Sequence, residues 1–92
     1  MIRSFKSKDT KALFEGIAVP ELQNLRTVAL RKLDMLNAAT RLSDLRALPA
    51  NRLEALVGDR KGQHSIRING QFRICFRWSE AGPEDVEIVD YH

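Results

Sequence analysis

RLEALVGDRKGQHSIRINGQFRICFRW, residues 52–78, is the stretch of sequence that decides the fold. Its second half alternates apolar and polar residues on both sides of an Asn-Gly pair, which is the strongest local signal of a β-hairpin. The alternation puts six apolar side chains on one face and three cationic ones on the other: Ile66, Ile68, Phe72, Ile74, Phe76 and Trp78 against Arg67, Arg73 and Arg77. We therefore expect one face to join a core and the other to form a cationic surface.

The length of the hairpin turn decides whether this division of the faces is kept. A two-residue turn at the Asn-Gly pair would split the apolar residues between both faces, because a shift of one residue turns every side chain over. We predict a three-residue turn at positions 69–71, which pairs Ile66 with Ile74. This register also sets Arg67 opposite Arg73. Like charges in such a pair are unfavourable, so an anion, a carboxylate or a partner must lie beside them.

Length and cysteine content limit the kind of protein. Ninety-two residues suit a single modest core, and we expect residues 1–92 to form one domain. The one cysteine, Cys75, excludes an intramolecular disulfide and is typical of a reducing compartment. No apolar run is long enough to span a bilayer, and the N-terminus lacks the apolar segment of a signal peptide. The sequence thus predicts a cytoplasmic protein that does not associate with membranes.

The net charge of +3 conceals an asymmetry along the chain. Residues 52–78 carry six Arg or Lys residues against two acidic ones, whereas residues 79–92 carry five acidic residues and no Arg or Lys. A cationic surface of this size suits nucleic-acid phosphates or an acidic protein partner. Small basic domains also carry merely solvated charges, so charge alone does not separate these interpretations.

Helical patterns precede the hairpin. Ser7 suits the N-cap of a helix over residues 8–15. A second and longer helix begins at Pro20, and its apolar residues recur at helical spacing. We interpret this stripe as core: Leu22, Leu25, Ala29, Leu33 and Leu36. The connection that follows has at most a helical turn at 43–45 and ends at Pro49.

Strands are predicted on both sides of the hairpin. Residues 2–5 predict a first strand at the sheet edge, residues 52–56 a strand before the hairpin, and residues 86–90 a last strand after a turn at Gly82-Pro83. The expected fold is α+β, with two N-terminal helices packed on one face of a mainly antiparallel four- to five-stranded sheet. The cationic face of that sheet is then the candidate working surface.

The chemistry that these residues permit is narrow. The sequence has no metal-ligand spacing, phosphate loop, dinucleotide fingerprint or serine-nucleophile elbow, and we expect neither a metal nor a cofactor. Arginine, histidine, tyrosine and carboxylate side chains remain. They suffice for cleavage of RNA, because the ribose 2′-hydroxyl is itself the nucleophile.

The run GDRKGQHSIRINGQFRICFRW, residues 58–78, followed by the terminal VEIVDYH, residues 86–92, resembles the HigB family of toxins in the RelE-like superfamily. The opening MIRSFK and the order of the helices agree, so the resemblance covers essentially the whole chain. It implies a toxin of a type II toxin–antitoxin system that cleaves ribosome-bound mRNA at the decoding site. It also implies a HigA-type helix-turn-helix antitoxin, with operator DNA bound only through that antitoxin.

The resemblance implies site residues where positions match. Arg73 would hold the scissile phosphate or stabilise its pentavalent transition state. Tyr91 and His92 match the terminal pair of the family and would orient the RNA and assist proton transfer. Asp90 precedes them and would either hold His92 in place or favour its protonated form.

Further cations are assigned to substrate binding. Arg67 is added on geometric grounds, because it is expected to lie opposite Arg73. Arg60, Lys61 and Arg77 complete the predicted substrate-binding set.

One departure from the family pattern concerns the general base. Certain relatives carry a His and a Lys on the strand before the GDR run, where this chain has Glu54 and Val57. Glu54 is therefore a candidate base if the fold buries it, and His92 is the other candidate. The base would deprotonate the 2′-hydroxyl, and the products would carry a 2′,3′-cyclic phosphate and a 5′-hydroxyl.

Two other interpretations stay open from the sequence. In the first, the chain is a non-catalytic basic domain that binds RNA or an acidic protein through the same face. In the second, it is an inactive relative kept for antitoxin binding. Both predict a cationic face without cleavage. An Arg73→Ala substitution separates the binding domain from an enzyme, because a binder loses affinity with nothing cleaved, and normal growth on induction without antitoxin would favour the inactive relative.

Overall fold

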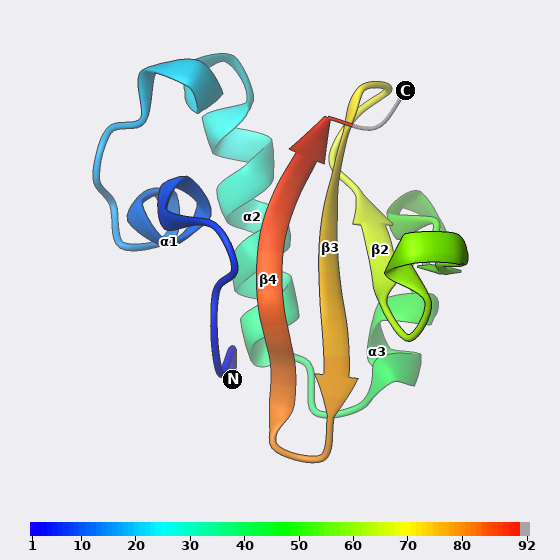
Figure 1. The fold of residues 1–92 in the computed structure, drawn as a ribbon. Coiled ribbons are helices and arrows are strands. Elements are labelled where there is room, and N and C mark those ends of the chain that lie inside the picture. Colours follow the sequence, from blue (N-terminus) through cyan, green and yellow to red (C-terminus); the bar gives the residue numbers. More distant parts are fainter. Residues whose placement is uncertain (91–92) are drawn as a thin grey trace.

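The computed structural model describes residues 1–90 and consists of helices packed against one antiparallel sheet (Figure 1). Within these residues the sheet has four strands, and each pairs with the next along the chain: β1 (Glu54–Ala55), β2 (His64–Arg67), β3 (Phe72–Ser79) and β4 (Gly82–Asp90). The helices are α1 (Lys8–Phe14), α2 (Arg26–Ala38) and α3 (Leu42–Arg46), with 3₁₀ helices η1 (Pro20–Leu25), η2 (Pro49–Asn51) and η3 (Gly58–Arg60). The predicted α+β fold is confirmed.

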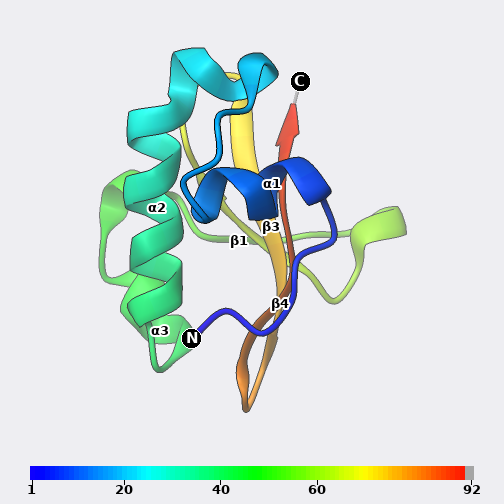
Figure 2. The same cartoon turned by 90° about the vertical axis from the view of Figure 1, so that its left-hand side faces the viewer.

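The layers are seen when the molecule is viewed from the side (Figure 2). Helices α2 and α3 cover one face of the sheet, and α1 lies beside β4. The loop that carries η3 projects from the opposite side of the sheet. The second face is therefore covered only in part, and it is the face on which the predicted arginines lie.

The N-terminal helices follow the predicted pattern with one difference. Ser7 caps α1, because its Oγ accepts a hydrogen bond from the Thr10 backbone N–H at 3.2 Å. The second helix does not begin as an α-helix: residues Pro20–Leu25 form η1, and α2 starts at Arg26. Leu25 leaves helical geometry (φ −115°, ψ 8°), which separates the two segments while it keeps the apolar stripe on one side.

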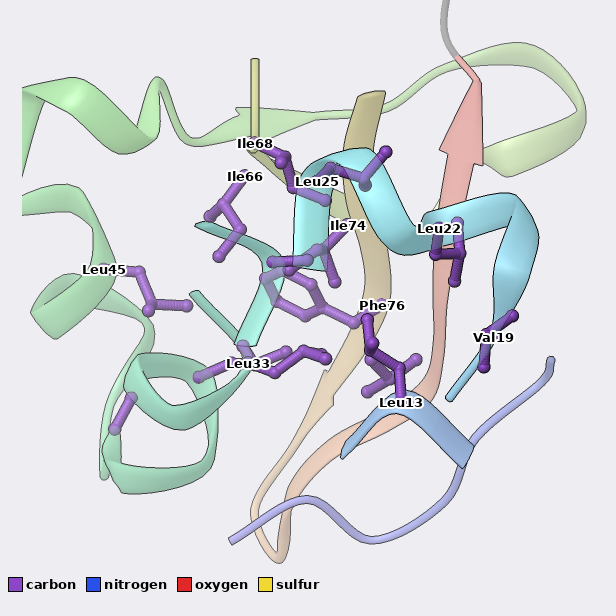
Figure 3. Close-up of a cluster of buried hydrophobic side chains, with 14 residues drawn as sticks. Leu13, Val19, Leu22, Leu25, Leu33, Leu45, Ile66, Ile68, Ile74 and Phe76 are labelled. Carbon is purple, nitrogen blue, oxygen red and sulfur yellow. The ribbon is translucent and has the colours of Figure 1, made fainter. Parts of the chain in front are cut away.

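The hydrophobic core joins the helical stripe to the sheet (Figure 3). Leu33 of α2 and Phe76 of β3 belong to one buried cluster, and Ile66 and Ile74 point into the same space from neighbouring strands. All five stripe residues are buried, as predicted: Leu22, Leu25, Ala29, Leu33 and Leu36. Burial of this apolar surface is the main term that holds the helices on the sheet.

The hairpin has the predicted register. Ile66 pairs with Ile74 and Arg67 with Arg73, and the chain reverses through residues 68–72. The turn is closed by Asn69, whose Oδ1 accepts from the backbone N–H groups of Gln71 and Phe72, each at 2.8 Å. The three-residue turn at positions 69–71 is thus confirmed.

Two predicted strands are shorter than expected. Residues 2–5 lie at the sheet edge but form a single parallel bridge, between Phe5 and Val86, rather than a strand. The predicted strand at residues 52–56 is limited to Glu54–Ala55. It cannot begin at Arg52, because this residue adopts a left-handed conformation (φ 44°, ψ 54°) at the end of η2.

The prediction of a turn at Gly82-Pro83 was wrong. Both residues belong to β4, and the chain reverses at residues 80–81, between the paired Ser79 and Gly82. Gly82 has φ +127°, and a Cβ there would collide with the backbone carbonyl of Met1. This glycine is required for the close approach of the N-terminal segment rather than for the turn.

We expect Leu33→Ala to lower the free energy of unfolding by about 2–5 kcal/mol, because Leu33 is fully buried and its truncation leaves a cavity. Urea unfolding followed by circular dichroism measures the change. Val57→Ala is the control: Val57 is 84% exposed, so we expect a change within about 0.5 kcal/mol. Equal losses in the two variants would contradict the place of Leu33 in the core.

Candidate active site

Arg73 lies on β3 with its guanidinium held by the neighbouring strand. Its Nε donates to Ser65 Oγ at 2.7 Å, and Nη2 donates to the carbonyl of Arg52 at 2.6 Å and to that of Ser65 at 3.4 Å. The residue is only 9% exposed. These fixed partners leave the planar group little rotational freedom, which preorganises it for an anion.

The remaining nitrogen of Arg73, Nη1, faces Glu54. It lies 3.7 Å from Glu54 Oε1, which is an ion pair but is longer than a hydrogen bond. Among residues 1–90 no hydrogen bond has this nitrogen as its donor. Nη1 is therefore the part of the guanidinium that is available to donate to a phosphate oxygen.

A pocket of about 290 Å³ opens in front of this guanidinium. We call it the Arg73 pocket, and its lining residues are Arg52, Glu54, Arg67, Asn69, Gly70 and Arg73. Arg67 is held at its rim, because its Nε donates to the carbonyl of Asn69 at 3.1 Å. Three predicted site residues, Glu54, Arg67 and Arg73, are thus brought together.

Glu54 places a carboxylate beside the two arginines that face each other across the hairpin. The strand register sets Arg67 opposite Arg73, and Glu54 lies opposite Ser65 on the next strand. Its negative charge offsets the positive charge of the buried arginine, while the neutral oxygens of Ser65 and Arg52 accept the hydrogen bonds. Of the three compensating groups that were predicted, an anion, a carboxylate or a partner, a carboxylate is present within residues 1–90.

The predicted role of Glu54 as a general base required a buried side chain, and the side chain of Glu54 is not buried. Its side chain is 54% exposed and is paired with Arg73. Water therefore reaches the carboxylate of Glu54. Its contact with Arg73 favours a role in orienting the guanidinium.

The other predicted cations lie outside this pocket. Arg60 Nη1 is 2.7 Å from Glu87 Oε1 on β4, and Arg77 Nε is 3.6 Å from Asp85 Oδ2. Lys61 is exposed at the end of η3. Two of the five acidic residues after position 78, Asp85 and Glu87, thus lie beside cations that precede them in the chain, and the charge asymmetry of the sequence is partly neutralised in the fold.

The C-terminal candidates are described only in part. Asp90 ends β4 opposite Phe72 and accepts a hydrogen bond from Gln71 Nε2 at 3.0 Å. The last described residue therefore lies beside the hairpin turn whose residues 69 and 70 line the Arg73 pocket. Tyr91 and His92 fall outside the described residues, and their predicted roles stay predictions.

Sequence reasoning missed two contributors to the site. Ser65 alternates with Arg67 on the same strand, so the period of two that placed the arginines also places the serine on their face. Arg52 contributes its carbonyl and lines the pocket through a left-handed backbone that no local signal indicated. Strained conformations of this kind are frequent at functional sites.

The cysteine does not line the Arg73 pocket. Cys75 is fully buried, and burial raises the pKa of its thiol, which disfavours the nucleophilic thiolate. Within residues 1–90, no group of three or more His, Cys, Asp or Glu side chains is arranged to hold a metal ion. In the same range, no helix is both long and apolar enough to cross a membrane.

Comparison with known proteins identifies the family. The chain matches the family described as "RelE-like toxin of type II toxin-antitoxin system HigB" over residues 3–92. Toxin HigB-1 of Vibrio cholerae is 40% identical over 80 residues, covering 85% of this chain and 84% of the relative. Endoribonuclease HigB of Proteus vulgaris is 30% identical over 97 residues and is covered completely.

A solved structure supports the fold. The YoeB-YefM complex from Staphylococcus aureus contains a chain that matches all of this one with a TM-score of 0.63 at 15% sequence identity, and 98% of that chain is covered. The protein is therefore built on the RelE-like toxin fold, an α+β architecture of helices on an antiparallel sheet. It belongs to the HigB family of toxins of type II toxin–antitoxin systems.

The protonation of His64 allows a pH-dependent test of how stably the sheet beside the Arg73 pocket is packed. Its ring stacks on Phe76 at 6.3 Å, and its buried Nδ1 has no hydrogen-bond partner within residues 1–90. Burial, and secondarily the charge of Arg46, lowers the pKa of His64 below its usual value of about 6.5. The unfolded chain therefore binds the proton first as the pH falls.

The resulting stabilisation is fully present above about pH 6.5 and is lost as the pH falls through the lowered pKa. We expect the free energy of unfolding of the wild type to decrease more between about pH 7.5 and 5.5 than that of His64→Gln, measured by urea unfolding. A parallel decrease in both proteins would show that His64 is not responsible.

Proposed function

We propose that this toxin is an endoribonuclease that cleaves ribosome-bound mRNA by attack of a ribose 2′-hydroxyl on the adjacent phosphate. The observation that carries the proposal is the guanidinium of Arg73, fixed through Nε and Nη2 with Nη1 directed at a pocket. The name of the Proteus vulgaris relative, Endoribonuclease HigB, supports the reaction class. A cationic face that only binds RNA is the alternative, and binding alone does not require an arginine that is held this rigidly.

The proposed role of Arg73 is to stabilise charge that develops on the phosphorane. Because its partners are fixed before the substrate arrives, the guanidinium pays no reorganisation cost during the reaction. Arg67, at the rim of the same pocket, supplies a second positive charge. The two cations would neutralise the dianionic phosphorane and orient the line of attack.

We assign the transfer of the proton to the C-terminal residues. His92 is the proposed base toward the 2′-hydroxyl, with Tyr91 orienting the RNA and Asp90 supporting the imidazolium. The position of Asp90 beside the hairpin turn supports this assignment, since residues 69 and 70 of that turn line the Arg73 pocket. The nucleophile belongs to the substrate, so the proposed reaction requires no metal ion or cofactor.

We propose further that the ribosome supplies the substrate geometry. The Arg73 pocket is small and open, and few side chains are available to align a flexible RNA within it. The mRNA strand held in the decoding site would arrive already ordered, and free RNA would be a poor substrate. Residues 1–92 would act as one domain in the cytoplasm, where ribosomes are found.

The proposed protein partner is a HigA-type helix-turn-helix antitoxin. Support comes from the type II toxin–antitoxin family to which the chain belongs. The structural neighbour was likewise solved as a complex, YoeB-YefM. Operator DNA would be contacted only through the antitoxin, since the cations of the sheet face are assigned to mRNA.

We expect Arg73→Ala to lower kcat for cleavage of ribosome-bound mRNA by about 10²–10³-fold, because it removes the donor to the phosphorane. Primer extension on an mRNA paused in purified bacterial ribosomes measures the cuts. A variant that lacks His92 should lose activity by about 10²–10⁴-fold if the terminus provides the base. Ribosome binding by both variants should stay close to that of the wild type.

Controls in the same assay separate the interpretations. Free mRNA tests the dependence on the ribosome, a chelator tests the dependence on metal ions, and thermal unfolding tests whether Arg73→Ala still folds. Absence of cleavage by folded wild-type protein that binds ribosomes would refute the enzyme and favour a binding domain or an inactive relative.

We expect Glu54→Gln to lower kcat by at most about fivefold, because an exposed ion pair contributes roughly 0.2–1 kcal/mol to the orientation of Arg73. The pH dependence of cleavage should keep its acidic limb. A general base would behave differently, with a loss of about 10²–10⁴-fold and the disappearance of that limb. Single-turnover cleavage on ribosomes across the pH range measures both quantities.

A further inference from the structure

A second and larger hollow lies directly beside the Arg73 pocket. Its volume is about 450 Å³, within the range of roughly 300–1,000 Å³ that is usual for ligand sites. We call it the α2 pocket, and it is lined by Arg31, Lys32 and Met35 of α2, Ala50 of η2, and Arg67, Ile68, Asn69 and Gly70 of the hairpin. Arg67, Asn69 and Gly70 line both pockets, so the hairpin turn is their common wall.

The α2 pocket gathers positive charge. Arg31 and Lys32 come from the helix and Arg67 from the hairpin, and the lining contains no carboxylate. None of the ion pairs within residues 1–90 involves these three cations, whereas Arg73 and Arg77 have carboxylate neighbours. Three cations without a carboxylate in ion-pair contact give the hollow a positive potential, which suits an anion.

The position of Lys32 is fixed by a buried residue. Its Nζ donates to Oδ1 of Asn51 at 2.6 Å, and Asn51 has no exposed surface. The amide of Asn51 is itself held, because Nδ2 donates to the carbonyl of Leu45 at 3.1 Å and contacts Met35 Sδ at 3.2 Å. A surface lysine normally samples many rotamers, but this one is tethered at the rim of a pocket.

The electrostatics of Lys32 agree with this placement. Burial, followed by the charge of Arg31, lowers the pKa of Lys32 from its usual value. Both causes disfavour the ammonium in the absence of an anion. A phosphate in the α2 pocket would reverse this effect.

The rest of the lining is apolar. Met35, Ala50 and Ile68 contribute side chains beside the cations. Proteins that bind single-stranded nucleic acid combine cations that follow the backbone with side chains, most often aromatic, that pack on the bases. In this pocket the adaptable thioether of Met35 and the side chain of Ile68 would contact the base or ribose. The lining thus offers both components in one hollow.

We propose that the α2 pocket is a second RNA subsite, which holds the nucleotide next to the scissile one through its phosphate, with Arg31 and Lys32 as ligands. The strand would pass over the common wall at Asn69 and Gly70, and Arg67 would lie between successive phosphates. This inference rests on the proposed ribonuclease function, since it takes the Arg73 pocket as the place of cleavage. To that function the inference adds the direction in which the bound RNA continues beyond the Arg73 pocket.

The test uses a 2′-O-methylated tetrauridylate, which lacks the nucleophilic hydroxyl and is not cut, and measures its affinity for the full-length toxin by fluorescence anisotropy. We expect Lys32→Met and Arg31→Gln each to weaken binding by about tenfold, as for loss of a charge-assisted hydrogen bond. Each should also flatten the dependence of log affinity on log salt by about 0.7, the contribution of one phosphate in single-stranded RNA.

Lys11→Met is the matched control, since Lys11 is an exposed cation on α1 that lines neither pocket. Arg31→Gln guards against an indirect effect, because Arg31 is exposed and takes no part in the tether to Asn51. Amide chemical shifts of the labelled wild type should change at Met35 as well as at Gly70. Unchanged affinity and salt slope in Arg31→Gln, or shifts confined to the Arg73 pocket, would overturn the proposal.

Failure of the subsite and failure of the proposed function give different results. If the wild type cleaves mRNA on ribosomes while Arg31→Gln binds the oligonucleotide normally, the function stands and the subsite does not. If the wild type fails to cleave but its binding depends on Arg31 and Lys32, RNA binding in the α2 pocket stands, whereas the ribonuclease proposal and the position of the pocket next to a scissile nucleotide do not.

Discussion

The side-chain oxygen of Asn69 determines much of this structure through two short hydrogen bonds. It accepts from the backbone N–H groups of Gln71 and Phe72, both at 2.8 Å, and so fixes a turn with an odd number of residues. Because one residue more or fewer would turn each side chain of the hairpin to the other face, this turn separates core from cationic surface. It also sets Arg67 opposite Arg73 and forms the wall between two pockets.

The burial of Arg73 then requires compensation from the surrounding residues. A guanidinium that is 9% exposed loses most of its hydration, and an unpaired charge in this position would be strongly destabilising. The structure distributes the compensation over a hydroxyl, two carbonyls and one half-exposed carboxylate. Because the nearest anion is loosely held at 3.7 Å, an entering phosphate can compete with Glu54 for the remaining nitrogen.

Much of the fold was predictable because its signals are local. Alternation gave the hairpin faces, helical spacing gave the stripe that includes Leu33, and Ser7 marked the start of α1. Contacts between distant positions were not predictable. The carboxylate beside Arg60, that of Glu87, is 27 residues away, and the side chain that accepts from Lys32 is 19 residues away in a segment with no regular pattern. The left-handed backbone of Arg52 likewise depends on the packed chain around it, since arginine has no preference for that conformation.

The pairing at the N-terminus has a consequence for how the sheet meets other chains. Arg3 and Lys6 donate backbone hydrogen bonds to β4, Val86 donates to Ser4, and the hydroxyl of Thr10 accepts from the Ile88 N–H. The outer edge of β4 is therefore already occupied, and the opposite edge is formed by a β1 of only two residues. A sheet closed in this way resists the edge-to-edge association that leads to aggregation. The first six residues of the chain thus act as a built-in cover that keeps the outer edge of β4 from pairing with a strand of another molecule.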